Sequence, residues 1–341
     1  MPTQVQGVIF EYSHTIGRCE RSGPGFSVPW AVARGAGERM YVVNRSQENR
    51  PDGRRVTICT VGEDYIGEFA RGTAGFGEEA SADLVWPTSL ALDKGGNVYL
   101  ADEWLNRISI FTKDGAWIGK WGIPGSGDGE IDQPSGLAFD GEDNLYLVDT
   151  GNNRIQKFTR DGKFLAKWGW AGSGDGEFNL PWGIDIDSSG DVYVADWRND
   201  RIQKFTPEGR FLMKFGSSGA GDGQFNRPTG VAVDKEGIIY VADRGNQRLQ
   251  VFDADGRFIT KMTGDATISK WGKSKVDANP DMWKQREVAQ GLGRLKLFWG
   301  PTAVEVDDQG RVFVVDSVRD RIQVYRKIAP FFLGLYDEGR L

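Results

Sequence analysis

One segment of this chain recurs at a fixed spacing, and its period limits the folds open to the chain. Residues 133–169 read QPSGLAFDGEDNLYLVDTGNNRIQKFTRDGKFLAKWG, and residues 180–216 read LPWGIDIDSSGDVYVADWRNDRIQKFTPEGRFLMKFG. A third copy, RPTGVAVDKEGIIYVADRGNQRLQVFDADGRFITKM, covers residues 227–262. A proline near the start of each copy lies 47 residues from the next. A regular period of this size indicates stacked supersecondary units.

Within one copy the pattern predicts four short strands. Apolar and polar residues alternate in each strand, and Gly-, Asn-, Asp- or Pro-containing turns separate the strands. In the second copy the predicted strands are residues 182–187, 192–196, 201–205 and 210–216. Four short antiparallel strands in a radially repeated unit are typical of a β-propeller blade.

Counting the anchor prolines gives six blades. The anchors are Pro29, Pro87, Pro134, Pro181, Pro228 and Pro301. The last blade has only three strands before its pattern ends, whereas residues 9–17 precede the first anchor and resemble an unpaired fourth strand. We therefore predict one all-β domain over residues 1–341, a six-bladed propeller closed by this N-terminal strand, which leaves no long free edge.

The repeats closely resemble those of the NHL family over nearly the whole chain. Three features carry the resemblance: the P-x-G start of the first strand, the Y-V-A-D second strand, and the N-x-R-I-Q-x-F segment after it. The family resemblance implies a structural role for one Asp and one Arg of each blade, which pin the turn. These pairs are Asp102 and Arg107, Asp149 and Arg154, Asp196 and Arg201, Asp243 and Arg248, and Asp316 and Arg321. Blade one departs from the pattern, because Asn44 replaces the Asp and residues 45–54 form a longer loop before Arg55.

Composition and charge narrow the function classes. The net charge of −6 offers no overall basic surface, so nucleic-acid binding is not expected. Cys19 and Cys59 do not make a disulfide framework, and the N-terminus shows no signal-peptide pattern. No stretch is long and apolar enough for a membrane span. We expect a soluble cytoplasmic protein with reduced thiols.

An insert separates the anchors of blades five and six. The interval from Pro228 to Pro301 is 26 residues longer than the standard one, and the segment that contains the extra length is 263–299. The stretch DANPDMWKQREVAQGL within it predicts a helix capped by Asp277, with Pro280 in the first turn and an end at Gly291 or Gly293. The insert either forms a lid over the mouth of the central channel or covers a blade edge.

Two acidic residues break the pattern expected around the central channel. Three residues after the position that follows each anchor, the chain has Ala33, Ala91, Ala138, Asp185, Ala232 and Glu305. Small residues are expected where six strands crowd together. Asp185 and Glu305 are therefore candidates for acid–base catalysis, for holding a divalent cation such as Ca²⁺, or simply for solvating a water-filled channel.

Tryptophan and arginine residues are expected around the mouth on the top face, where the loops between second and third strands meet. Both residue types are over-used at binding surfaces. The candidate ligand-binding residues are Trp30, Trp104, Trp182, Trp197, Arg198, Arg244 and Arg319. The tryptophans would form an aromatic wall, and the arginines would reach for a carboxylate or a phosphate. Ordinary blade packing and solvated loop charge are the alternative.

Several catalytic sites are excluded or disfavoured. NHL-type amidating lyases use a histidine-rich zinc site, whereas this chain has a single histidine, His14. The loops GSGDGE (125–130), GSGDGEFN (172–179) and GAGDGQFN (219–226) lack the strand and helix context of a phosphate loop, and their recurrence predicts inter-blade turns. Calcium-dependent lactonases of the gluconolactonase and paraoxonase type need more oxygen ligands than Asp185 and Glu305 supply.

The sequence thus predicts a protein that binds a small molecule or a peptide at the central pocket of the top face. Two other classes remain open. One is a hydrolase or lyase, lactonase-like and cation-dependent, acting in the same pocket. The other is a scaffold for protein or RNA. Fold alone does not decide among them, and the ligand and the oligomeric state are not predicted.

Overall fold

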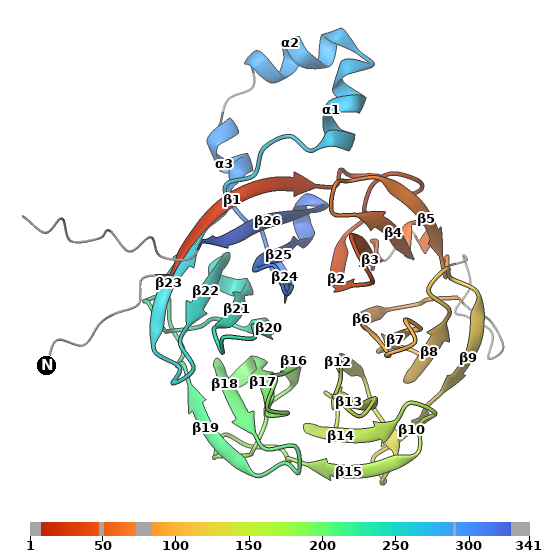
Figure 1. Ribbon diagram of the computed structural model, residues 1–341, viewed down its shortest axis with the longest axis vertical. Coiled ribbons are helices and arrows are strands. Elements are labelled where there is room, and N and C mark those ends of the chain that lie inside the picture. Colours follow the sequence, from red (N-terminus) through yellow and green to blue (C-terminus); the bar gives the residue numbers. More distant parts are fainter. Residues whose placement is uncertain (1–7, 48–50, 73–82, 289–290, 329–341) are drawn as a thin grey trace, which may run out of the picture.

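The computed structural model describes residues 8–47, 51–72, 83–288 and 291–328. Its strands form six four-stranded antiparallel sheets arranged as a ring around a central axis (Figure 1). The first three blades are β2 (Pro29–Arg34), β3 (Arg39–Asn44), β4 (Arg55–Thr60) and β5 (Tyr65–Phe69); β6 (Pro87–Leu92), β7 (Val98–Asp102), β8 (Arg107–Phe111) and β9 (Trp117–Trp121); and β12 (Pro134–Phe139), β13 (Asn144–Asp149), β14 (Arg154–Thr159) and β15 (Phe164–Trp168). A two-stranded pair, β10 (Ile123–Pro124) and β11 (Glu130–Ile131), lies in the loop before the third blade.

The other three blades repeat the same order. They are β16 (Pro181–Ile186), β17 (Val192–Asp196), β18 (Arg201–Phe205) and β19 (Phe211–Phe215); β20 (Pro228–Val233), β21 (Ile239–Asp243), β22 (Arg248–Phe252) and β23 (Phe258–Met262); and β24 (Pro301–Val306), β25 (Arg311–Asp316), β26 (Arg321–Ile328) and β1 (Ile9–Ile16). The six-bladed propeller predicted from the repeat is confirmed, and every inner strand begins at an anchor proline.

The N-terminal strand closes the ring. β1 pairs antiparallel with β26, from Ile9 opposite Ile328 to Ile16 opposite Ile322. The first and last strands of the ring therefore share one sheet, as the unpaired pattern at residues 9–17 predicted. This pairing removes the sheet edges that an open ring would expose between its two ends.

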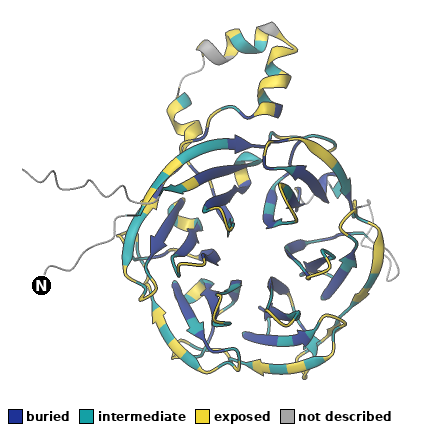
Figure 2. Cartoon of the chain, in the orientation of Figure 1, coloured by how far each residue is buried: buried dark blue, intermediate teal, exposed yellow. Residues whose placement is uncertain are grey.

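The hydrophobic core lies between neighbouring blades. One cluster, for example, joins Tyr146 and Val148 of blade three to Val192 and Val194 of blade four. In blade four, for example, the second strand β17 is buried along its whole length, whereas the outermost strand β19 alternates between partly buried and exposed residues (Figure 2). Each blade is thus held mainly by apolar contact with its two neighbours.

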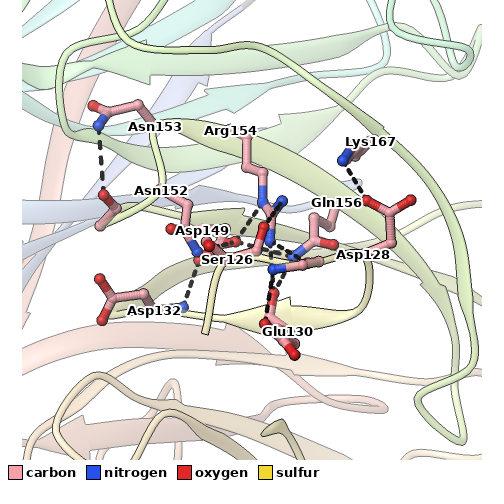
Figure 3. Close-up of polar contacts among 12 residues, drawn as sticks. Ser126, Asp128, Glu130, Asp132, Asp149, Asn152, Asn153, Arg154, Gln156 and Lys167 are labelled. Carbon is pink, nitrogen blue, oxygen red and sulfur yellow. Dashed lines mark hydrogen bonds and ion pairs between the residues drawn. The ribbon is translucent and has the colours of Figure 1, made fainter. Parts of the chain in front are cut away.

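A buried Asp–Arg pair fastens the loop that enters each regular blade. In blade three the Arg154 Nε donates to Asp149 Oδ2 at 2.7 Å, and the terminal nitrogens of Arg154 donate to the carbonyl oxygens of Ser126, Gly127 and Glu130 (Figure 3). The same pair recurs as Asp196–Arg201, Asp243–Arg248 and Asp316–Arg321. The structural role expected of this pair is confirmed in these four blades, and the glycine-rich segments are inter-blade turns.

Blade one replaces the pair with a neutral amide. Asn44 is fully buried, and its Oδ1 accepts from the backbone N–H of Ser27 at 2.8 Å. Without an aspartate beside it, Arg55 forms an ion pair with Glu68, with 3.0 Å between Nε and Oε2. The polar contacts beside the longer loop of blade one therefore differ from those at the same position in the other blades.

The insert contains three helices, α1 (Lys270–Asp277), α2 (Pro280–Val288) and α3 (Leu292–Lys296). The predicted single helix is thus partly wrong. Asp277 is the last residue of α1 and does not cap the next helix, although α2 does begin at Pro280. Residues 289 and 290 lie outside the described chain.

The insert lies beside the ring, outside strand β1 (Figure 1). Trp271 is buried there, and its ring meets the Phe26 ring edge to face with 5.8 Å between centroids. The Glu63 carboxylate accepts backbone N–H groups from Gly17 at 2.7 Å and from Trp271 at 3.1 Å. These contacts hold the insert at the blade edge, and none of its described residues lines the channel. In the structure the described part of the insert thus lies at a blade edge and not over the channel.

Candidate functional site

The six inner strands enclose a central cavity of about 260 Å³. Its lining runs from the residues that follow the anchor prolines, at the top face, to the ends of the same strands, near Arg34, Leu92 and Phe139. Trp30, Trp182, Asp185 and Glu305 all line it, so the structure brings these four predicted residues to one channel.

A belt of hydroxyl groups links the inner strands at the top of the channel. Each hydroxyl donates to a backbone carbonyl oxygen of the next blade. The four bonds are Thr88 to Pro134 at 2.9 Å, Ser135 to Trp182 at 2.8 Å, Thr229 to Pro301 at 3.3 Å, and Thr302 to Trp30 at 2.8 Å. Blades one and four have tryptophan instead of a hydroxyl at this position, so these two blades depart from the belt.

Trp30 and Trp182 meet across the top of the channel. Blades one and four are three positions apart in a ring of six and thus face each other (Figure 1). The two indole rings pack edge to face with 6.3 Å between centroids, and Trp197 continues the row at 6.2 Å from Trp182. An aromatic row of Trp30, Trp182 and Trp197 therefore crosses the mouth.

Arginine side chains stack against this aromatic row. The Arg244 guanidinium lies 5.3 Å from the centre of the Trp30 ring, and Arg227 lies 5.2 Å from Trp197. Arg198 stacks on Trp197 as well, at 5.4 Å, from a solvent-exposed position. Positive charges within about 6 Å of an aromatic face are attracted to it.

The mouth also contains residues that the sequence analysis did not single out. Arg45 lies between Trp30 and Trp86, with its guanidinium 4.5 Å from each ring centre, and forms an ion pair with Glu103. Burial lowers the pKa of Arg45 to about 10, against the opposing effect of Glu103. Arg45 is the first residue of the longer loop in blade one. The unusual length of that loop was the feature of the sequence that could have indicated Arg45.

Two predicted residues lie away from this row. Trp104 is 59% exposed and does not line the channel. Arg319 belongs to a different cavity, beside the insert, where its guanidinium lies 5.3 Å from the Trp299 ring. The fold therefore separates Arg319 from the channel mouth, because the loop between β25 and β26 of blade six lies against the insert.

Arg244 has no anionic partner among the described residues. It is half-buried, and no ion pair or side-chain hydrogen bond to its guanidinium occurs in the part of the chain that the structure describes. Burial lowers its pKa, and the positive charge of Arg227 lowers it further. A desolvated cation of this kind would be stabilised by an anion.

Asp185 and Glu305 lie deeper in the channel. Along a strand, three residues span about 10 Å, which separates Asp185 from the Trp182 level. Burial raises the pKa of Asp185 to about 6, although the backbone N–H of Val233 donates to its Oδ2 at 2.7 Å. Burial and then the negative charge of Asp185 raise the pKa of Glu305 to about 8. Glu305 therefore keeps its proton to higher pH than Asp185 does.

The cation hypothesis gains no ligands from the structure. Within the described residues no group of three or more His, Cys, Asp or Glu side chains converges to hold a metal ion. Asp185 and Glu305 alone supply fewer oxygens than the six or more that Ca²⁺ takes.

No helix in the described ranges is long and apolar enough to cross a membrane.

Comparison with known proteins supports the fold. The NHL repeat matches residues 132–158, 178–205 and 225–252. A Bacteroides thetaiotaomicron protein of unknown function is similar in structure, with a TM-score of 0.64 and 18% identity, over 94% of this chain and 76% of that one. An auxiliary nutrient binding protein from the same organism has a TM-score of 0.62 and 12% identity, over 94% and 77% of the two chains.

A third similar structure is catalytically inactive virginiamycin B lyase from Staphylococcus aureus with Quinupristin. Its TM-score is 0.57 at 13% identity, over 94% of this chain and 100% of that one. No curated protein matches the sequence. At these identities the likeness concerns the fold and not the chemistry. The repeat matches and the ring of sheets together show that the chain contains NHL repeats and has the fold of a six-bladed β-propeller.

Proposed function

We propose that the protein binds a small anionic ligand, a carboxylate or phosphate attached to an apolar group, at the mouth of its central channel. The observation that carries the proposal is Arg244, a half-buried cation without a described anionic partner, stacked on Trp30. Arg227 adds a second positive charge, and Trp182 offers an aromatic face beside them.

Unused hydrogen-bond donors favour the same kind of ligand. The indole N–H groups of Trp30, Trp86 and Trp197 are buried, and none has an acceptor among the described residues. A buried donor without an acceptor costs about 1–3 kcal/mol. Oxygen atoms of a bound carboxylate or phosphate would satisfy such donors when the indole rings turn toward them.

The proposal predicts that benzoate binds saturably and changes tryptophan fluorescence, whereas uncharged benzamide does not. Replacing Arg244 with alanine should weaken benzoate binding about tenfold or more, since a hydrogen bond to a charged group contributes about 1.5–3 kcal/mol. Trp182→Ala should weaken it as well, with the melting temperature changed by only a few degrees. Fluorescence titration of each variant measures both effects.

Arg257→Ala is the matched control, because Arg257 is exposed and forms its described ion pairs with Asp253 and Asp255 on an outer turn. Equal benzoate affinity in the wild-type protein and in Arg244→Ala would contradict the proposal. A protein that served only as a scaffold, with Trp30 and Trp182 closing its channel, would bind neither probe.

The unequal acids favour a second candidate, a hydrolase or lyase acting below the same mouth. Two carboxyl groups whose environments push their pKa values apart can serve as a general acid and a general base. Glu305 would donate a proton and Asp185 would accept one. Turnover of an ester or lactone that Glu305→Gln abolishes, without loss of benzoate binding, would distinguish catalysis from binding alone.

A further inference from the structure

A second cavity lies between the insert and blade six. It measures about 570 Å³ and is walled by the segment before α1, by α3, by the end of β1 and by the loop from β25 to β26. No part of the channel lining belongs to it. It is therefore a second space, which adjoins the mouth only through a groove lined by Arg227 and Arg244. It contains Arg319, which the sequence pattern had assigned to the mouth.

The wall formed by the insert is firmly attached. Ser269 caps α1 by accepting from the backbone N–H of Gly272 at 3.0 Å, and its hydroxyl donates to the Gly17 carbonyl oxygen at 2.7 Å. Phe298 is 1% exposed in the core cluster between blades five and six. The cavity thus has fixed sides on both the insert and the propeller, as a preformed site requires.

Large apolar side chains are exposed in this cavity. Leu295 is 43% exposed, Trp299 is 52% exposed and Val318 is 51% exposed. All three line the same space. Apolar side chains that gather at one place on a surface mark an interaction site more often than isolated ones do.

The charged residues that line this cavity are all positive. Lys296, Arg319 and Arg321 line the cavity, and no Asp or Glu is among its described lining residues. A groove that shares Trp299 and Val318 with the cavity continues toward Arg227 and Arg244, again without an acidic lining residue in the described chain. The net charge of the whole chain is −6, so this positive strip contrasts with the rest of the protein.

Arg319 is a cation of this strip that remains available. Arg321 is already used, because it donates to Asp316 and to the carbonyl oxygens of Leu295 and Leu297. Arg319 donates to the Arg294 carbonyl oxygen at 2.7 Å, but its buried Nε has no described acceptor. Burial, and then the charge of Arg321, lowers the pKa of Arg319. A carboxylate would satisfy its free donors in the paired geometry that arginine favours.

We propose that this cleft and the adjoining groove bind an acidic peptide segment of a partner protein, in which a large apolar side chain stands next to a carboxylate. The apolar side chain packs on Leu295 and Trp299, and the carboxylate pairs with Arg319. An extended chain fits the shape, because the cavity opens into a groove with further arginines. Charge complementarity and the exposed apolar floor together select this partner.

Fluorescence anisotropy tests the proposal with a labelled, acetylated peptide LFDELF and its amide counterpart LFNQLF on the full chain. The acidic peptide should bind saturably, and the amide peptide should bind at least tenfold more weakly, because a charged hydrogen bond is lost. Arg319→Gln should weaken the acidic peptide at least tenfold, whereas Arg257→Ala should leave it unchanged.

A second variant keeps the test decisive if Arg319→Gln destabilises the blade. Leu295→Asp changes an exposed position and places a repelling charge in the cleft, so it should abolish peptide binding with little change in melting temperature. Equal binding of the two peptides, or full binding by both variants, would overturn the proposal. It would also be overturned if an oligonucleotide displaced the peptide at equal concentration, or if sedimentation showed a dimer that Arg319→Gln dissolves.

Discussion

Replacing Asp196 with alanine is expected to lower the free energy of unfolding by about 3–5 kcal/mol, because the change leaves a buried guanidinium unpaired. Asp196 is fully buried, and its carboxylate accepts from the backbone N–H of Asn179 and from the side chains of Asn199, Arg201 and Gln203, all at 2.8–3.1 Å. The variant loses all four acceptor contacts at once. Urea denaturation followed by circular dichroism measures the change.

The matched control is Asp175→Ala in the inter-blade loop that leads into the same blade. Asp175 forms an ion pair with Lys214 at 2.6 Å, but both side chains are about half exposed. Exposed pairs contribute about 0–1 kcal/mol, so this variant should stay close to the wild-type protein. Similar losses from the two replacements would show that the buried pair does not fasten the loop as described.

Replacing Glu305 with glutamine is expected to flatten the dependence of stability on pH. Burial and the charge of Asp185 raise the pKa of Glu305 from 4.5 to about 8. Between these values the folded protein binds more protons at this group than the unfolded chain does. The stabilising contribution is therefore complete below about pH 4.5 and is lost as the pH rises to about 8.

The wild-type protein should lose about 1–3 kcal/mol relative to Glu305→Gln across this range, less than the full shift implies because the channel leaves Glu305 partly accessible. Paired denaturation curves at pH 5 and pH 8.5 give the difference. Asp185→Asn should lower the pKa of Glu305, because it removes a neighbouring negative charge, and so narrow the range. Parallel pH profiles for the wild-type protein and Glu305→Gln would contradict the assignment.

Repetition made the architecture predictable from sequence. Each copy of the repeat predicts the same strands and turns, so the positions of the anchor prolines predicted where all six inner strands begin. The Asp–Arg pairs recur at a constant spacing, and the structure confirms their role for Asp149 and Arg154 as for three later pairs. Ring closure followed because blade six lacked one strand and residues 9–17 supplied one.

The residues of the candidate site could be predicted from the sequence only in part. The inner strands and the loops differ in how far the repeat determines their side chains. Trp30, Trp182, Asp185 and Glu305 belong to inner strands, and the repeat fixes which way an inner strand faces. The side chains of the loops do not follow the repeat, so the repeat does not predict which of them face the channel. Arg45 and Trp86 were missed, although Arg45 opens the longer loop of blade one and Trp86 immediately precedes an anchor proline.

The insert shows the same limit most clearly. Its length and its place between blades five and six follow from the interval between Pro228 and Pro301. Its position does not follow from that interval, because it depends on the contact of Trp271 with Phe26 and on hydrogen bonds from the backbone N–H groups of Gly17 and Trp271 to Glu63 of blade one. With the insert at the blade edge, Arg319 of the loop between β25 and β26 lines a second cavity together with residues of the insert.

Local periodicity thus determined the number of blades, their order and the residues that face the axis. Which loop side chains converge was decided only in three dimensions. Whether they converge depends on contacts between residues far apart in the chain. The repeat fixes the backbone at those positions, but it does not fix which side chain each variable position carries or what that side chain contacts.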